Sequence, residues 1–516
     1  MSLWTTVPMT WTDMLLSPEL CLAAFFLVLV VIDLFLKSES RQVIGWGALL
    51  GLLAAAGLTI YRIVEMNPAG EAAAHSYQWL NYSYVVDDFG SLLKLAFLGA
   101  TSLIVLMALS SVKRDDTITA KGELYYLLLP AAAGAMIMAS SGNLVTLYIG
   151  LELLSITSYV LVALRKRSSQ SAEAAFKYVV TGGISSAFIL FGISYLYGVT
   201  GTVDLSVFRT ALPEAASSYP ALVYVGFFML LTGFAVKIAA APFHAWAPDV
   251  YQGAPAPVSA FLAVVVKGAA LAALLRIVYN TAFSASGGSG LKVGDDVFTA
   301  LMAIAAAAMI IGNIAALRQY QMKRLLALSG VANAGYLLVP IALNFTVLHS
   351  NNVAEFIFYL VAYLLMNIGA FAVVTVIGQA EGNEELSGFS GLYYRAPWTA
   401  AAMVVFLLSL AGLPISAGFF GKLFILFGAA SAKAYWMVAI MAISSVISYY
   451  FYFAVIRQMF MRSSSEDKPV RVPAAIGTVI WLCAIATVAL GLWPEPLLNW
   501  IEAVFTIRGD LFLMPG

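Results

Sequence analysis

Residues 220–250 read PALVYVGFFMLLTGFAVKIAAAPFHAWAPDV, and this stretch decides the fold. It is apolar over about 31 residues, which as a straight helix at 1.5 Å per residue would measure roughly 46 Å. Because the hydrocarbon core of a bilayer is only ~30 Å thick, the stretch is too long for one straight crossing. Pro242 and Pro248 interrupt it. We therefore expect two half-helices joined by unwound backbone, which is tolerated at membrane depth only inside protein or beside a wet cavity.

A second stretch, residues 397–430, has the same character. Its roughly 34 residues would measure about 51 Å as a straight helix, and Gly412-Leu413-Pro414 interrupts it. Elsewhere, apolar runs of about 20 residues follow one another along the chain. We expect an all-α polytopic membrane protein with about 14 transmembrane helices, of which the seventh and twelfth are broken. The expected spans are 18–37, 43–64, 88–112, 123–141, 143–164, 173–199, 220–250, 256–280, 295–316, 322–345, 353–379, 397–430, 435–461 and 472–494.

The composition supports a membrane protein and excludes several other classes. Of the 516 residues, 62% are hydrophobic and only 10% are charged, and the mean hydropathy is +0.91. The 27 basic and 27 acidic residues balance, so nothing indicates binding to nucleic acid. Two isolated cysteines and three histidines have no spacing typical of an iron–sulfur cluster or a haem site. If the protein takes part in redox chemistry, the electrons are expected to travel elsewhere.

Five lysines lie inside the expected spans, together with one glutamate. An ammonium at the bilayer centre costs about 2.5–3.5 kcal/mol on insertion scales, so six unpaired ionisable groups would cost on the order of 15–20 kcal/mol. That is comparable to the whole stability of a typical protein. We therefore interpret these residues as a path for protons or ions. They are Lys94, Lys177, Lys237, Lys267 and Lys422, with Glu152.

The shallower residues also have structural explanations. Lys94 lies near a span end, from which its side chain can reach the interface. Lys177 follows Glu173 at the i+4 spacing of a helical ion pair, so an ion pair and a role in proton entry are equally open. An alternative role for His244 is to bond backbone groups that Pro248 frees. A functional role is favoured for the four deeper residues, which are Glu152, Lys237, Lys267 and Lys422.

The positions of the basic residues predict the orientation. Loops after odd-numbered spans hold 16 of the 27 Lys and Arg residues, and the other loops and the N-terminus hold 6. The odd loops are therefore expected in the cytoplasm and both termini outside, with Arg318, Lys323 and Arg324 as topology determinants.

The two broken spans lie five apart, which suggests two five-helix units. An odd number of spans inverts the second unit relative to the first, as in many transporters. Ser158-Tyr-Val-Leu-Val resembles Gly335-Tyr-Leu-Leu-Val in the span five later. We expect four segments: an N-terminal three-helix segment (1–122), a first repeat (123–280), a second repeat (295–461), and a C-terminal helix and tail (462–516).

Several motifs resemble those of the antiporter-like subunits of respiratory complex I. The most specific is GFAVKIAAAPFHAWAPDVYQGAPAPVSAF at residues 233–261. LELLSITSYVLVAL around Glu152, EAAFKYVVTGG around Lys177, QMKRLLALSGVANAGY from Gln321 and LAGLPISAGFFGKLFI around Lys422 also match, in the expected order along nearly the whole chain. Two related branches of this family resemble each other in having Glu at the position that matches residue 422. This sequence has Lys there.

The resemblance implies a proton-translocating subunit of the membrane arm of a bacterial NADH–quinone oxidoreductase. Glu152 matches a glutamate that pairs with a seventh-span lysine, here Lys237. Lys267 matches the eighth-span lysine and Lys422 the terminal one, while His244 is a candidate link between Lys237 and Lys267. A lysine in an apolar site holds its proton less tightly and a nearby carboxylate opposes this, so a Glu152–Lys237 pair would act as a switch.

The resemblance also implies where the remaining chemistry takes place. No cofactor is expected on this chain, because NADH, FMN, iron–sulfur clusters and quinone would be bound by other subunits of the complex. The expected partners are other membrane-arm subunits, including antiporter-like subunits and a small neighbouring subunit, and the lipid of a bacterial cell membrane. The alternative function is a proton/sodium antiporter subunit of a multi-subunit antiporter. A solute transporter is a weaker third possibility.

Overall fold

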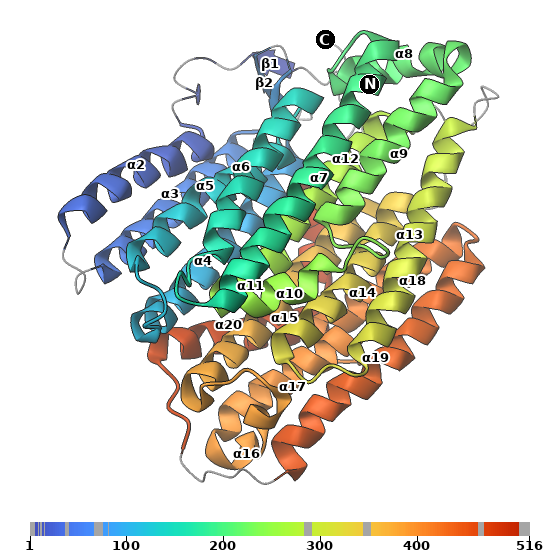
Figure 1. Ribbon diagram of the computed structural model, residues 1–516. Coiled ribbons are helices and arrows are strands. Elements are labelled where there is room, and N and C mark those ends of the chain that lie inside the picture. Colours follow the sequence, from blue (N-terminus) through green and yellow to red (C-terminus); the bar gives the residue numbers. More distant parts are fainter. Residues whose placement is uncertain are drawn as a thin grey trace.

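The computed structural model describes residues 6–8, 10, 13–14, 16–36, 41–66, 76–80, 82–282, 292–343, 352–462 and 469–504. Within these residues the chain forms a bundle of long helices (Figure 1). Thirteen of them are long and apolar enough to cross a membrane, and two shorter apolar helices make up a further span. The all-α polytopic fold is therefore confirmed.

The helix boundaries agree closely with the expected spans. Twelve spans are α2 (Pro18–Phe35), α3 (Gln42–Met66), α4 (Asp88–Arg114), α5 (Lys121–Ala139), α6 (Leu144–Val162), α7 (Ser169–Thr200), α9 (Pro220–Lys237), α13 (Val293–Ala316), α14 (Met322–Ala342), α15 (Asn352–Glu381), α19 (Tyr435–Met461) and α20 (Ala474–Leu492). The span at 256–280 consists of α11 (Ala256–Phe261), η2 (Leu262–Val266) and α12 (Lys267–Asn280).

Both expected breaks are present. α9 ends at Lys237, and a run of turns connects it to the short helix α10 (Trp246–Gly253). The other broken span consists of α17 (Pro397–Ala411) and α18 (Ala417–Ser431). Gly412 caps α17 with a φ of 82°, a left-handed conformation that favours glycine at a helix end. Lys237 therefore precedes the break in its span, whereas Lys422 follows the break in its own span.

The span at 256–280 has an irregularity that the hydrophobic pattern did not predict. η2 is a π-helical turn, and it ends immediately before Lys267. Such turns are rare, occur mostly as single bulges inside α-helices, and are frequent at functional sites.

Three smaller features were also not predicted. A three-stranded sheet joins β1 (Thr6–Pro8) in parallel to β2 (Ser76–Trp79), which pairs antiparallel with β3 (Tyr84–Val86). The amphipathic helix α8 (Leu205–Ser218) lies at the same end of the bundle, opposite α16 (Leu392–Arg395) (Figure 1). The third is the short helix α21 (Glu495–Val504) near the end of the described chain.

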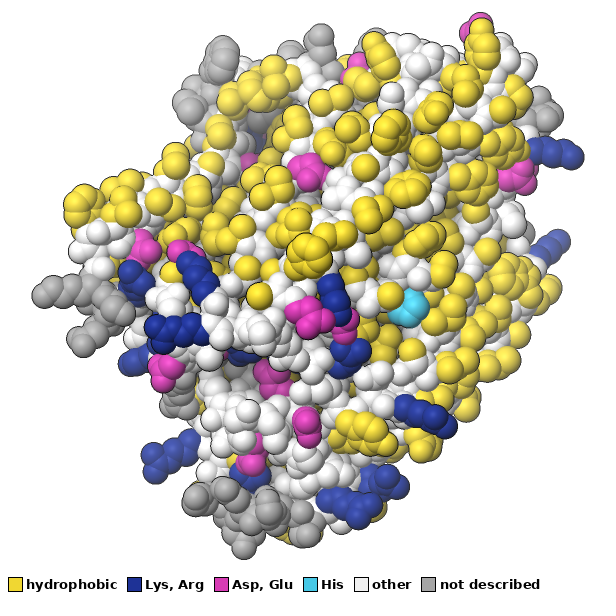
Figure 2. All heavy atoms as spheres, viewed as in Figure 1, with side chains coloured by type: hydrophobic (Ala, Val, Ile, Leu, Met, Phe, Trp, Pro, Cys, Tyr) yellow, Lys and Arg dark blue, Asp and Glu magenta, His cyan; other side chains and the backbone are white. Residues whose placement is uncertain are grey.

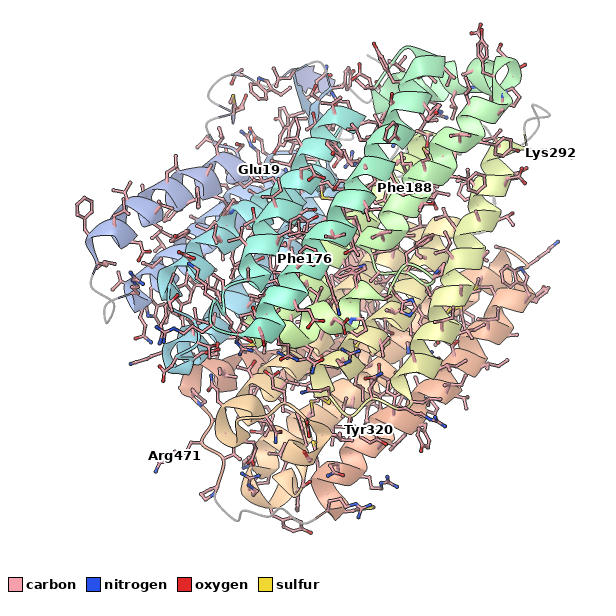
Figure 3. All side chains as sticks on the ribbon, in the orientation of Figure 1. Glu19, Phe176, Phe188, Lys292, Tyr320 and Arg471 are labelled. Atoms are coloured by element: carbon pink, nitrogen blue, oxygen red, sulfur yellow. The ribbon has the colours of Figure 1, made fainter. Side chains whose placement is uncertain are left out.

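The centre of the bundle is formed by α14 and the span at 256–280, whose residues are buried throughout. Outer helices carry exposed apolar side chains such as Phe176, which projects from α7 (Figure 3). In the same view Tyr320 and Arg471, from loops after odd spans, lie at one end and Lys292 lies toward the other. Figure 2 shows Lys and Arg side chains gathered toward the end where these odd loops lie.

The two helix pairs α5–α6 and α13–α14 pack in the same way. A Cβ atom on Gly134 would lie 2.7 Å from the backbone nitrogen of Leu154, and one on Gly312 would lie 2.7 Å from that of Ala332. The two glycines therefore allow equally close backbone approach in both pairs. This equivalence is what two related five-helix units would produce, and the repeat itself stays a prediction.

Candidate functional site

Lys237 lies at the C-terminal end of α9, where it faces polar side chains of α6 and α7. Its Nζ atom donates to Ser155 Oγ at 2.9 Å, to Ser186 Oγ at 3.1 Å and to the Tyr159 hydroxyl at 3.5 Å. All three acceptors are neutral. The side chain is half-buried, and three hydroxyl groups from two neighbouring helices hold its amine in place.

Glu152 lies one helical turn before Ser155 on α6. Positions i and i+3 of a helix are neighbours on its surface, so the carboxylate is close to the Lys237 site. The described residues show no ion pair between Glu152 and Lys237, and Glu152 Oε1 is buried without a hydrogen-bond partner. In this arrangement Lys237 is bonded to Ser155 and not to the carboxylate one turn earlier.

Lys267 begins α12 directly after the π-helical turn and is 2% exposed. Its Nζ atom donates to the backbone carbonyl of Gly330 at 2.7 Å. A Cβ atom on Gly330 would lie 3.0 Å from both Lys267 Nζ and the Tyr363 hydroxyl, so these two polar groups lie near each other. The Tyr363 hydroxyl is buried and has no hydrogen-bond partner among the described residues.

Lys422 lies in α18 and is 8% exposed. Its Nζ atom donates to the carbonyl oxygens of Leu410 at 2.8 Å and Ala411 at 3.4 Å, and lies 4.6 Å from the centre of the Tyr336 ring. The last carbonyls of a helix lack partners within that helix and carry partial negative charge. The break after α17 therefore supplies the acceptors that hold this lysine.

A network of buried polar side chains surrounds α14, the helix that also carries the Gly330 acceptor of Lys267 and the Tyr336 ring beside Lys422. Ser329 Oγ and the Tyr452 hydroxyl lie 2.5 Å apart, and Asn333 Nδ2 donates to Ser329 Oγ at 3.3 Å. The Tyr359 hydroxyl donates to Asn333 Oδ1 at 2.9 Å. The network draws on α14, α15 and α19, and no sequence motif predicted it. The i, i+4 spacing of Ser329 and Asn333 inside an apolar span was the available signal.

Lys177 is placed in an ion-pair network at the surface. Its Nζ atom lies 2.7 Å from Glu173 Oε1 and 2.6 Å from Asp249 Oδ2, and the side chain is 39% exposed. Asp249 is also paired with Arg324. The helical ion pair expected from the i+4 spacing is therefore present. Within the described part of the chain, no direct hydrogen bond or ion pair joins this network to the three deeper lysines.

His244 lies in the turns between α9 and α10, beside the exposed residues Pro242 and Phe243. Its ring is half-buried, and Nδ1 is buried without a hydrogen-bond partner. Among the described residues, no hydrogen bond joins His244 to Lys237 or Lys267.

Lys94 does not reach the surface of the protein, in contrast to the interfacial position expected for it. It is 1% exposed, and its Nζ atom lies 2.8 Å from Glu19 Oε1 and donates to the Tyr84 hydroxyl at 2.8 Å. The partner glutamate is 75 residues earlier in the chain, in α2, so the pairing could not be read from spacing within α4.

Two further ion pairs with buried members were missed. Lys323, expected to be a topology determinant, is completely buried and bonds Glu384 Oε2 at 2.6 Å and the Ala254 carbonyl at 2.8 Å. Arg276 and Asp87 form an ion pair at 2.7 Å with both side chains completely buried. The latter pair joins residues 189 positions apart, a contact without a local signal in the sequence.

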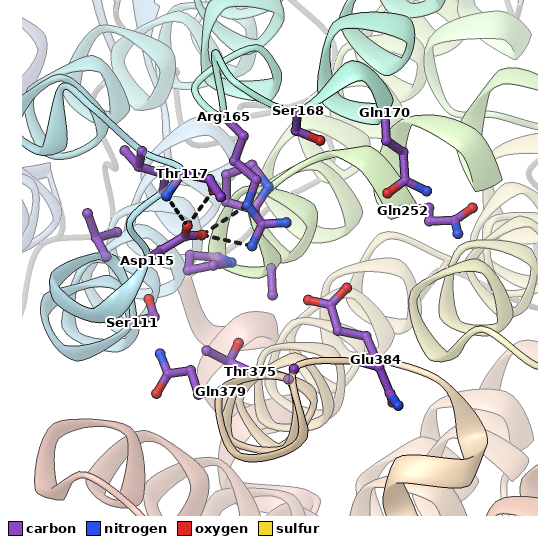
Figure 4. Close-up of a pocket in the computed structure, with 18 of the residues that line it drawn as sticks. Ser111, Asp115, Thr117, Arg165, Ser168, Gln170, Gln252, Thr375, Gln379 and Glu384 are labelled. Carbon is purple, nitrogen blue, oxygen red and sulfur yellow. Dashed lines mark hydrogen bonds and ion pairs between the residues drawn. The ribbon is translucent and has the colours of Figure 1, made fainter.

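A polar cavity of about 480 Å³ opens where the loops after the third, fifth, seventh, ninth and eleventh spans meet (Figure 4). On its wall, Arg165 Nη2 lies 2.9 Å from Asp115 Oδ2, and the Thr117 backbone N–H donates to Asp115 Oδ1 at 2.9 Å. Partial burial alone would raise the pKa of Asp115, but Arg165 and Thr117 lower it below its ordinary value. The charges nearest the cavity are thus largely paired.

The three deep lysines share one chemical property. Their described hydrogen-bond acceptors are hydroxyl and carbonyl oxygens, which can hold an ammonium or a neutral amine because both donate N–H groups. This arrangement suits proton exchange. Among the described residues, no three His, Cys, Asp or Glu side chains come together as a metal site.

Known proteins with similar sequences and structures were found by comparison. The family model described as NADH:quinone oxidoreductase/Mrp antiporter, TM, matches residues 141–448. NADH-quinone oxidoreductase subunit N of Paenibacillus sp. (strain JDR-2) is 68% identical over 516 residues, covering 98% of this chain and 99% of the relative. The subunit N of Bacillus anthracis is 40% identical over 520 residues, covering 100% of this chain and 99% of the relative.

Two solved structures extend the comparison. A chain of respiratory complex I from Thermus thermophilus with bound Aureothin is 31% identical, with a TM-score of 0.75, covering 93% of this chain and 98% of that one. A chain of the Mrp complex from Dietzia sp. DQ12-45-1b has a TM-score of 0.81 at 21% identity, covering 98% of each chain, which shows a shared fold alone. The chain therefore belongs to the NADH:quinone oxidoreductase/Mrp antiporter transmembrane family, and within it to the subunit N group of the NADH-quinone oxidoreductases.

Proposed function

We propose that this chain translocates protons as a membrane-arm subunit of an NADH–quinone oxidoreductase, driven by quinone reduction in other subunits. The observation that carries the proposal is the set of three deep lysines, each held by neutral acceptors beside a broken or irregular helix. Ionisable residues inside a membrane bundle are expensive and usually mark an ion or proton path. The 68% identity to a subunit N supports the same assignment.

Each site residue has a proposed role. Glu152 and Lys237 form the switch, in which movement of the Lys237 amine toward or away from the carboxylate decides whether it keeps its proton. Lys267 passes the proton on through the α14 network, and Lys422 is the terminal site. His244, with its unpartnered Nδ1, is a link that water would complete. Lys177 carries the least support, because its ion pairs hold it at the surface.

The two repeats are proposed to place equivalent tyrosines beside two of the lysines. Tyr159 and Tyr336 match in the short repeat motif. The ring of Tyr159 is centred 6.0 Å from Lys237 Nζ, and the ring of Tyr336 is centred 4.6 Å from Lys422 Nζ. This correspondence supports units at 123–280 and 295–461, flanked by the segments 1–122 and 462–516.

The surroundings of the chain follow from the same assignment. Relatives are subunits of an oxidoreductase, so the chain would act as part of an enzyme, with NADH, FMN, iron–sulfur clusters and quinone held by other subunits. Its neighbours would be further antiporter-like subunits and a small subunit of the membrane arm. We place it in the bacterial cell membrane, with the basic loops in the cytoplasm and both termini outside.

Replacement of Lys237 by Ala tests the proposal. We expect assembled Lys237→Ala complex in inverted vesicles to lose most NADH-driven proton pumping, by about tenfold or more, since tenfold corresponds to only ~1.4 kcal/mol. Lys433→Ala, on a loop outside the lysine sites, is the matched control and should pump normally. Normal pumping by an assembled Lys237→Ala complex would refute the role. Pumping that requires sodium would instead favour the antiporter alternative.

A further inference from the structure

The polar cavity lies at the end of the bundle where the basic loops meet. Its wall is formed by residues 111–118, 165–170, 252–257 and 375–384, together with Gln321. Because a water molecule occupies about 30 Å³ in the liquid, the volume of about 480 Å³ has room for on the order of ten waters. Nine of the twenty lining residues carry amides or hydroxyls, and Asp115 is paired with Arg165, so the cavity is suited to water (Figure 4).

A row of polar side chains leads inward from this cavity along α15. Gln379 and Thr375 lie on the cavity wall, and Asn367 and Tyr363 follow at deeper positions. With Phe371, these residues are spaced by four, so that each lies one turn from the next. The row spans about 24 Å at 1.5 Å per residue, which is enough to reach from the loop end to mid-membrane.

Several polar atoms of this row lack partners, although Thr375 Oγ1 and Asn367 Nδ2 donate to backbone carbonyls of α15. Both side-chain atoms of Gln379, the Oδ1 atom of Asn367 and the hydroxyl of Tyr363 are buried without a hydrogen bond. Asn367 is completely buried and Tyr363 is 1% exposed. Buried polar groups are normally bonded to protein or to ordered water, so a row of unsatisfied ones indicates bound water.

The inner end of the row reaches a deep lysine. The Tyr363 hydroxyl and Lys267 Nζ each lie 3.0 Å from the position of a Cβ atom on Gly330, close enough for one water to bridge them. The row therefore joins the cavity to Lys267, with one interruption.

Phe371 is that interruption. It is completely buried, between Thr375 and Asn367 in the row, and its ring centre lies 6.3 Å from that of Tyr251, which is also buried. Apolar constrictions gate water-filled paths by drying. A site that exchanges protons with two sides of a membrane needs such a closure, because a route wet from end to end would leak.

We infer that the α15 row is the proton intake from the basic-loop side to Lys267, with Phe371 as its gate. Protons would pass through the waters held by Gln379, Thr375, Asn367 and Tyr363 to the neutral amine of Lys267 when Phe371 moves aside. The inference rests on the proposed function and adds the entry route and the residues that form it.

Accessibility to silver ion tests the route without any need for pumping. The starting complex has both cysteines of this chain, Cys21 and Cys483, replaced by Ala. One cysteine at a time is then introduced, as Thr375→Cys, Asn367→Cys or Thr487→Cys. Each variant is exposed to Ag⁺ in inverted vesicles. The remaining free thiol is then labelled with fluorescent maleimide after denaturation. We expect Thr375→Cys to react readily and Asn367→Cys to react slowly. Thr487, whose buried hydroxyl on α20 is also unpartnered, lies outside the row and should stay protected.

Opening the gate gives the decisive comparison. Phe371→Ala should speed Ag⁺ reaction at Asn367→Cys by about tenfold, because the lost ring leaves room for water beside Asn367. Phe356→Ala removes an equally buried ring elsewhere on α15, and it should leave the rate of the Ag⁺ reaction at Asn367→Cys unchanged. Protection of Asn367→Cys in both backgrounds, or equal acceleration at Thr487→Cys, would overturn the gate. If Asn367→Cys reacted faster with Ag⁺ added from the opposite face of the membrane than from the basic-loop face, the proposed intake direction would be wrong.

Turnover gives an independent readout. Asn367→Leu keeps the side-chain size but removes the groups that hold water, so NADH-driven pumping should fall about tenfold while Asn367→Ser retains most of it. Thr487→Val should pump normally. If Lys237→Ala abolishes pumping but Asn367→Leu does not affect it, the intake route is wrong and the proposed function stands. If silver enters as expected but neither variant affects pumping, the proposed function fails.

Discussion

At the residue scale, six lysines of the bundle fall into two groups. One group is paired with carboxylates and therefore has a structural role: Lys94 with Glu19, Lys177 with Glu173 and Asp249, and Lys323 with Glu384. The other group is held by neutral oxygens: Lys237, Lys267 and Lys422. Removing a proton from the first group would leave a carboxylate unpaired, which is costly in a buried site. The second group can change protonation without that cost.

Glu152 is the carboxylate that distinguishes the Lys237 site from the other two. Glu152→Gln preserves the shape of the side chain and removes its charge, so Lys237 loses the group that favours its ammonium form. We expect pumping coupled to NADH oxidation to fall by on the order of tenfold, as a change of ~1.4 kcal/mol would produce. The ratio of protons moved to NADH oxidised, measured in inverted vesicles, checks this.

A surface glutamate provides the control for that measurement. Glu123 pairs with Lys166 at 3.5 Å in an exposed position, and such pairs contribute about 0–1 kcal/mol. Glu123→Gln should therefore leave the ratio unchanged. If Glu152→Gln also leaves it unchanged, Glu152 is a packing residue.

At the scale of single elements, the end of α17 shows how a break positions a lysine. Gly412 adopts a φ of 82°, and a Cβ atom there would lie 2.9 Å from Lys422 Cδ. Gly412→Ala should strain the backbone by roughly 1–2 kcal/mol and displace the Lys422 side chain from its carbonyl acceptors. We expect pumping to fall severalfold in assembled complex, measured as above.

The matched control for Gly412 is Gly201, the left-handed cap of α7. Its φ is 71°, and a Cβ atom there would have no neighbour within 4 Å. Gly201→Ala should therefore carry similar backbone strain without touching a lysine, and should destabilise without loss of pumping. Equal loss in both variants would mean that strain alone, and not the position of Lys422, explains the effect.

Element boundaries could be predicted from the sequence because a span must be apolar for about 20 residues and its ends are polar. Pro242 and Gly412-Leu413-Pro414 located both breaks for the same local reason. The π-helical turn before Lys267 has no comparable signal, since residues 262–266 are uniformly apolar. The strands are three or four residues long and depend on partners far along the chain.

The site was only partly predictable. The lysines stand out because charge is rare in apolar spans. Lys237, Lys267 and Lys422 were expected to be deep, and in the structure Lys267 and Lys422 are buried and Lys237 is half-buried. The polar network on α14 did not stand out: Ser329, Asn333 and Tyr452 are ordinary in any helix until packing brings them together. The burial of Lys323 was not foreseen because its partner Glu384 lies 61 residues later, and a lysine near a helix end can be exposed or buried.

At the scale of the whole molecule, an ion pair between two completely buried side chains joins the start of α4 to α12, two segments far apart in the chain. Asp87 precedes α4 and Arg276 lies in α12, and their atoms approach to 2.7 Å with both side chains completely buried. The Nε and Nη1 atoms of Arg276 have no hydrogen-bond partner, so Asp87 is its main compensation among the described residues. Breaking this pair leaves an uncompensated charge between the two segments.

Asp87→Asn is therefore expected to destabilise the assembled protein by about 3–5 kcal/mol, because one partner of a buried pair is removed while the other keeps its charge. The measurement is the midpoint of thermal unfolding in detergent, which should fall clearly below that of the parent. Replacing both partners, as in Asp87→Leu with Arg276→Met, removes the stranded charge and should recover most of the loss. A double variant as unstable as Asp87→Asn would show that the pair stabilises through its geometry and not merely by mutual compensation of charge. In either case the deep lysine sites stay intact, so residual assembled complex should still pump.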